Sequence, residues 1–188
     1  MRQLKPGQTA PEFCATNVAG KTVRLSDYRG KTVLLTFQRN VGCPVCNLRF
    51  HALEQHRTDL RAKGIEVLAV YESAAVTTKQ YLGGQTPYAQ LIPDPEQKLY
   101  ALYGAERSFG KLLSGVLLHG GLGKMSASKK LNPHLPKQDG HPDRIGADFL
   151  IDPAGRIIRA HYHRFVGDDL PLSEVVADGL PNQAATAR

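Results

Sequence analysis

The chain has 188 residues, 41% hydrophobic and 22% charged, a composition that suits one globular domain and excludes a disordered or fibrous protein. Its formal charge is +7, but no nucleic-acid motif accompanies the charge, so we expect no nucleic-acid partner. No apolar run could span a bilayer and the N-terminus lacks the apolar stretch of a secretory signal, so we expect a cytoplasmic protein with no membrane partner.

The predicted elements alternate between strands and helices. The run TVLLTF at 32–37 is typical of a strand that is buried on both faces of a parallel sheet. In chain order we predict a hairpin around 13–15 and 23–25, the strand 32–37, a helix at 44–63, a strand at 65–71, a helix capped by Ser73, a strand near 89–92, a helix at 95–103, a hairpin of 148–152 and 156–162, and a helix at about 171–179. The tail 181–188 is expected to fray.

One stretch does not follow this alternation. Residues 107–144 are rich in Gly, Lys, Ser and His. We expect a short helix in LLSGVLLHG at 112–120 and otherwise a long loop, and long loops in compact domains often act as lids or interface elements. Disorder is the alternative.

The most informative residues are the five of the sequence GCPVC at 42–46, between the first buried strand and the helix that follows it. Chemistry in an open α/β sheet lies at the carboxyl ends of the strands. Cys43 is expected at the helix N-cap and Cys46 in the first turn, where backbone N–H groups and the helix dipole favour a thiolate. The spacing also lets the two sulfurs meet, so that an oxidised sulfur on one is resolved by the other. The pattern therefore predicts redox chemistry.

Two other interpretations of the cysteines stay open. They could be buried, inert thiols. They could also bind a metal ion, with Cys43, Cys46, His51 and either His161 or His163 as four ligands, although a single CxxC pair is a weak metal signal.

Four blocks of the sequence, in order, resemble the peroxiredoxins of the alkyl hydroperoxide reductase/thiol-specific antioxidant (AhpC/TSA) family. The blocks are 7–13, 23–31, 91–95 with 102–104, and 148–158. The resemblance implies an α/β, thioredoxin-like fold with an N-terminal β extension. It also implies a single domain over 4–180, with 107–144 inserted before the C-terminal hairpin.

The resemblance also implies roles for particular residues. Cys46 falls where this family has its peroxide-attacking cysteine, and Cys43 falls where the family usually has Thr or Ser. Arg39 replaces the family's Pro seven residues before that cysteine, and it is a candidate to stabilise a thiolate or to orient a peroxide oxygen. Gly146 stands where an Arg is usual, which makes Arg144, two residues upstream, the candidate replacement.

Four other residues are expected to be structural. Arg49 is expected to be solvated, and Cys14 to be a small buried hydrophobic residue. His161 and His163 alternate on one predicted strand and are expected at a solvated sheet edge.

We therefore predict that the protein is a thiol-dependent peroxidase. The Cys46 thiolate attacks a hydroperoxide, Cys43 closes a disulfide, and thioredoxin or a low-molecular-weight thiol reduces it. No metal or other cofactor is expected, and a homodimer is an option. The alternatives are a disulfide oxidoreductase in which Cys43 leads, and a redox sensor without catalysis.

Overall fold

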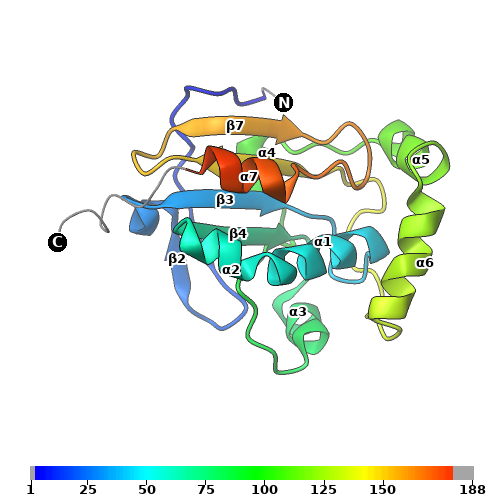
Figure 1. Ribbon diagram of the computed structural model, residues 1–188. Coiled ribbons are helices and arrows are strands. Elements are labelled where there is room, and N and C mark those ends of the chain that lie inside the picture. Colours follow the sequence, from blue (N-terminus) through cyan, green and yellow to red (C-terminus); the bar gives the residue numbers. More distant parts are fainter. Residues whose placement is uncertain (1–2, 180–188) are drawn as a thin grey trace.

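A computed structural model describes residues 3–179 of the chain (Figure 1). Its centre is a five-stranded sheet with the order β5-β4-β3-β6-β7. The strands are β3 (Thr32–Phe37), β4 (Ile65–Tyr71), β5 (Gln90–Pro93), β6 (Ala147–Ile151) and β7 (Ile157–Tyr162). β3, β4 and β5 are parallel, whereas β6 and β7 run antiparallel to their neighbours. The predicted strands are thus confirmed to within two residues at their ends.

The central strand β3 is buried on both faces because its residues feed two separate apolar layers. Leu34 packs in the layer that contains side chains of the helices after β3 and at the C-terminus. Val33, Leu35 and Phe37 point the other way and pack against Tyr100 and other side chains of the opposite layer. A continuous apolar run is therefore what this position requires.

Helices cover both faces of the sheet, as Figure 1 shows. One face is covered by α1 (Pro44–Gln55), α2 (Arg57–Ala62), α3 (Ala75–Leu82) and α7 (Leu172–Asp178). The other is covered by α4 (Lys98–Tyr103) and by the N-terminal β extension, formed by β1 (Cys14–Thr16), β2 (Thr22–Arg24) and the short helix η1 (Leu25–Tyr28). This mixed α/β architecture with an N-terminal extension agrees with the predicted fold class.

The predicted helix 44–63 is two helices that meet at His56. The interruption is slight, because His56 N donates to Ala52 O at 3.1 Å and Leu60 N donates to His56 O at 3.0 Å. The prediction that Ser73 caps the next helix is wrong. α3 begins after Ala74, and the backbone N–H of Ala74 donates to a carboxylate from far along the chain, Asp139 Oδ2, at 3.1 Å.

The segment 107–144 is more helical than the sequence predicted. α5 (Phe109–Leu117) corresponds to the expected short helix, but α6 (Gly121–Leu131) was expected to be loop, and that expectation is wrong. The sequence GLGKMSASKKL has two glycines and no clear apolar stripe. Its helix is stabilised by tertiary contacts instead, since buried Ser128 accepts a hydrogen bond from Asn47 Nδ2 of α1 at 2.9 Å.

The tail 181–188 lies outside the described residues, and the boundaries 4–180 of the predicted domain stay a prediction. Within residues 3–179, the structure contains no helix with the length and apolarity that a membrane crossing requires.

Candidate active site

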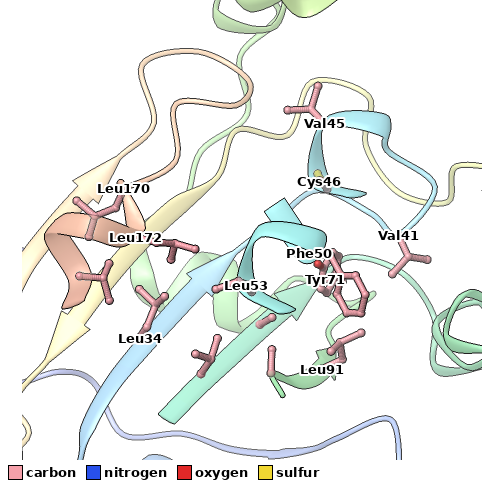
Figure 2. Close-up of a cluster of buried hydrophobic side chains, with 14 of the residues drawn as sticks. Leu34, Val41, Val45, Cys46, Phe50, Leu53, Tyr71, Leu91, Leu170 and Leu172 are labelled. Carbon is pink, nitrogen blue, oxygen red and sulfur yellow. The ribbon is translucent and has the colours of Figure 1, made fainter. Parts of the chain in front are cut away.

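The two cysteines of the CxxC motif lie at the start of helix α1, just after the loop that follows the central strand β3. Cys43 is the N-cap residue and Pro44 opens the helix, a position at which proline's missing N–H costs nothing. Cys46 is in the first turn, and Figure 2 shows it above Phe50 and Leu53, which face the sheet from the same helix. Both cysteines are reduced, and with exposures of 0% and 4% both are buried.

Arg39 contacts both sulfurs. Its backbone N–H donates to Cys46 Sγ at 3.4 Å, and its guanidinium Nη1 donates to Cys43 Sγ at 3.5 Å. A second guanidinium nitrogen, Nη2, donates to Pro142 O at 2.6 Å, while Nε is buried and has no partner among the described residues. Arg39 therefore places a positive charge and one free N–H donor beside the thiols.

The two thiols affect each other's pKa, so that one of them ionises readily and the other does not. A hydrogen bond from Cys46 is the largest influence that lowers the pKa of Cys43, and the Arg39 charge and backbone N–H groups of α1 lower it further, against the opposing effect of burial. Burial and the neighbouring Cys43 raise the pKa of Cys46. The pair thus favours one thiolate stabilised by the other thiol, with the charge mainly on Cys43.

A narrow crevice lies beside Cys46. Gln38, Arg39, Gly146, His163 and Asp169 line it together with Cys46. A side chain at Gly146 has no room, because its Cβ would lie 2.5 Å from Phe37 O and 2.6 Å from His163 Nδ1. The imidazole of His163 therefore fills the space that the usual Arg side chain at position 146 would need.

A buried charge network lies behind this crevice, and the sequence analysis missed it. Arg49 is 6% exposed, which contradicts the expected solvated side chain, and its guanidinium lies 3.6 Å from Asp148 Oδ2 and 3.8 Å from Asp169 Oδ1. His163 is also buried, so its expected place at a solvated edge is wrong, and its Nε2 lies 3.1 Å from Asp148 Oδ2. The spacing of Arg49 one turn after Cys46 was the available signal.

The charges in this network stabilise one another. Burial alone would raise the pKa of Asp148, but Arg49 and His163 hold it below its usual value. Burial would likewise lower the pKa of His163, but Asp148 outweighs burial and raises it. The network therefore favours an ionised carboxylate and a protonated imidazole next to the crevice.

Arg144 lies in a different set of contacts. Its guanidinium donates to Glu72, to Ala105 O at 2.9 Å and to Gln97, and it stacks over the Tyr100 ring at 4.5 Å. The structure thus brings Arg39 together with both cysteines, and it commits the Arg144 guanidinium to other partners.

Part of the segment 107–144 lies directly on the cysteine loop. The tightest approach is at Gly42, where a Cβ would lie 2.4 Å from Pro136 O. With the bonds from Arg39 to Pro142 and from Asn47 to Ser128, this packing explains why both sulfurs are buried.

The alternative metal site with His51 and His161 or His163 is not assembled in residues 3–179. The cluster with ligand atoms within 4.8 Å of one another consists of Asp148, His163 and Asp169, without either cysteine. Arg49 already supplies positive charge to both carboxylates of that cluster.

The remaining cysteine, Cys14, is exposed on β1, which corrects the expectation that it is buried.

Comparisons with known proteins agree with this architecture. The AhpC/TSA family matches residues 6–161. Peroxiredoxin Bcp of Escherichia coli strain K12 is 26% identical over 119 residues, covering 62% of this chain and 76% of its own. A protein of Mycobacterium tuberculosis that is named as a peroxiredoxin is 25% identical over 164 residues, covering 86% of this chain and 87% of its own.

Solved structures show the same fold. Peroxidoxin BcpB of M. tuberculosis superposes with a TM-score of 0.67 at 15% identity, covering 93% of this chain and 96% of its own. A thiol:disulfide interchange protein, DsbE of Chlorobium tepidum, superposes with a TM-score of 0.64 at 21% identity, covering 94% and 99%. The predicted thioredoxin-like fold and family are confirmed, and the chain belongs to the AhpC/TSA family.

Proposed function

We propose that the protein is a thiol peroxidase that reduces hydrogen peroxide or organic hydroperoxides through a Cys46–Cys43 thiol/disulfide cycle. The observation that carries the proposal is the contact of Arg39 with both sulfurs at the start of α1. Family membership and the peroxiredoxin names of the relatives support the reaction class.

The first step is attack on the peroxide by Cys46. The proton on Cys46 moves to Cys43 through their hydrogen bond, so that the shared negative charge arrives on the sulfur that lines the crevice. The Cys46 thiolate then attacks the near peroxide oxygen, the O–O bond breaks, and Cys46 becomes a sulfenic acid. The leaving alkoxide or hydroxide takes one proton and departs as alcohol or water.

Two groups are placed to assist this step. The unpartnered Nε–H of Arg39 is available to bind a peroxide oxygen and to stabilise its developing charge. His163, held by Asp148, lines the same crevice and is a candidate source of the proton for the leaving oxygen. Arg144 contacts neither of these groups directly, and we assign it a positioning role through Glu72, whose backbone N–H donates to Arg39 O at 2.8 Å.

The second step restores the enzyme. The Cys43 sulfur attacks the Cys46 sulfenic sulfur and gives up the proton that it received in the first step, the S–O bond breaks, and hydroxide leaves as water with that proton. Two electrons from thioredoxin or from two molecules of a low-molecular-weight thiol then reduce the disulfide. Because both sulfurs are buried, the reductant requires the segment over Gly42 to move. We place this cycle in the cytoplasm, where such reductants maintain dithiols.

Peroxide consumption by the purified protein with a thioredoxin system or glutathione tests the proposal. We expect turnover that falls at least ~100-fold in Cys46→Ser, and a Cys43→Ser variant that accumulates a sulfenic acid on Cys46. Cys14→Ser is the matched control, because Cys14 is exposed on β1, and it should retain full turnover.

The same assays separate the alternatives. Reduction of a protein disulfide without peroxide consumption, lost in Cys43→Ser, would identify a disulfide oxidoreductase. One oxidation event without turnover would identify a redox sensor.

A further inference from the structure

The exposed large apolar side chains are concentrated on one part of the molecule. Nine are exposed in residues 3–179, and seven of these lie between residues 109 and 131, with exposures of 37–77%. The seven are Phe109, Leu113, Leu117, Leu118, Leu122, Met125 and Leu131, here called the α5–α6 patch. Figure 1 places both helices at the end of the molecule where α1 begins.

The α5 side of the patch is a regular helix face. Phe109, Leu113 and Leu117 are spaced four residues apart, so they project from one side of the helix. Gly115 faces inward, where a Cβ would lie 2.9 Å from Val166 N. Because α5 is seated this tightly, it cannot rotate to bury its outer side chains.

α6 is fixed in the same way. Buried Ser128 is hydrogen-bonded to Asn47 of α1, and Lys124 Nζ donates to Gly167 O at 3.0 Å. A Cβ at Gly121 would lie 2.6 Å from Val116 Cα of α5, so the two helices are also in close contact with each other. The apolar side chains thus stay on the surface of the monomer.

The charges near the patch argue against an anionic membrane as its partner. Three of the nearby cations are committed within the chain: Arg107 pairs with Asp143, Lys111 pairs with Glu106, and Lys124 binds Gly167 O. Basic side chains that hold a helix on an anionic membrane must be free to meet lipid head groups. Here mainly Lys129 and Lys130, at one end of α6, are exposed in that way.

The size of the patch is that of a protein interface. Leu131 lies about two and a half turns from Leu122 and so faces the other side of α6. If a fully exposed large apolar side chain presents roughly 150–200 Å², the other six leave on the order of 600 Å² of apolar surface. The largest apolar patch on a typical monomer is ~300–600 Å², and a stable interface buries ~800 Å² on each partner. Apolar character without charged recognition groups is typical of permanent homodimers.

We propose that the α5–α6 patch is the interface of a homodimer of this chain. In a two-fold dimer the same patch lies on both partners, so the two helices of each copy pack against those of the other. Carboxylates neutralise Arg107 and Lys111, which reduces the repulsion between two such faces. Because α6 is bonded to α1, the interface would also hold the segment that covers the cysteines. The inference does not depend on peroxide chemistry.

Sedimentation velocity of the reduced protein, from nanomolar to tens of micromolar, tests the interface. We expect a dimer whose dissociation constant rises at least ~30-fold in Leu113→Asp and in Leu122→Asp, as for a central interface residue. The matched control is Val76→Asp, which changes an equally exposed apolar residue on α3 and should leave the dimer intact. Circular dichroism of each variant confirms that it is folded.

Three results would overturn the proposal. One is a wild-type monomer across the whole range, and another is a dimer that Leu113→Asp and Leu122→Asp leave unchanged. The third is a monomer that floats with phosphatidylcholine/phosphatidylglycerol vesicles but not with phosphatidylcholine alone, which would make the patch a membrane surface. Peroxide consumption is measured in parallel on the wild type and Val76→Asp, so a failure of the proposed function is seen separately.

Discussion

The β3–α1–β4 unit and the segment 107–144 meet at the cysteines, and they are held in place by different forces. The first is fixed by apolar packing on both faces of β3 and by a buried charge network around Asp148. The second is attached through close backbone packing at Gly42 and Gly115 and through polar contacts such as Ser128 to Asn47, and it turns large apolar side chains outward. The β3–α1–β4 unit, together with the charge network around Asp148, is therefore a rigid structural base that sets the chemistry of the sulfurs, and we call it the base. Segment 107–144 limits access to the sulfurs, and we call it the cover.

The largest expected effect lies in the base. Asp148→Ala leaves the Arg49 guanidinium buried beside one remaining carboxylate, so we expect a loss of about 3–5 kcal/mol in the free energy of unfolding. Urea denaturation measures it. The control is Asp178→Ala, which breaks the much more exposed pair with Arg159 and should cost less than ~1 kcal/mol. Equal costs for the two variants would mean that the network does not hold the base.

The next effect concerns thiolate stability. Arg39→Met removes the positive charge and the N–H donor beside Cys43 Sγ, so the pKa of the cysteine pair should rise. At pH values below the wild-type Cys43 pKa of about 6, the thiolate fraction, and with it the alkylation rate by iodoacetamide, should fall about tenfold for each unit of that rise. Arg57→Met, on the exposed surface of α2, is the control. An unchanged pH profile of alkylation in Arg39→Met would contradict the assigned role.

A smaller effect is expected in the cover. Ser128→Ala removes the hydrogen bond to buried Asn47, which should cost about 1 kcal/mol and favour local opening of α6. The alkylation rates of Cys43 and Cys46 should then increase, whereas the exposed Ser126→Ala should leave them unchanged. If neither variant alters the rates, α6 does not control access to the sulfurs.

The smallest expected effect is a pH dependence of the free energy of unfolding, caused by His163 in the charge network. His163 has a pKa raised by Asp148, so the stability it contributes is fully present below its unfolded pKa of about 6.5 and is lost as pH rises through the folded value. The stability difference between the wild type and His163→Gln should therefore shrink with rising pH above about 6.5. Urea denaturation at several pH values measures it, and a difference that grows with pH would contradict the assigned protonation state.

The sequence was sufficient to predict the base, for a physical reason. Buried parallel strands must be continuously apolar, so TVLLTF and IEVLAVY could be assigned, and the position of the CxxC motif followed from the strand before it. The cover could not be predicted in the same way. α6 has little intrinsic helical preference, and its helix depends on contacts with α1 that lie far apart in the sequence.

The sequence did not predict the charge network, because the residue type alone does not show which distant residue a charged side chain will pair with. Arg49 and His163 are of types usually found at the surface, and they are buried here because Asp148 and Asp169 compensate their charge. The prediction for Cys14 was wrong in the opposite sense: cysteine is usually buried, but on β1 Cys14 is exposed to solvent. Arg39 was found because it lies between the strand and the cysteines in the sequence.

The most direct test of the account is the site of the first oxidation. The Cys43→Ser and Cys46→Ser variants, each in a Cys14→Ser background, are treated with one equivalent of hydrogen peroxide in the presence of dimedone and analysed by mass spectrometry. We expect rapid formation of a dimedone adduct on Cys46 in Cys43→Ser and little adduct in Cys46→Ser. A rapid adduct on Cys43, with Cys46 unreactive, would contradict it and reverse the roles of the two thiols.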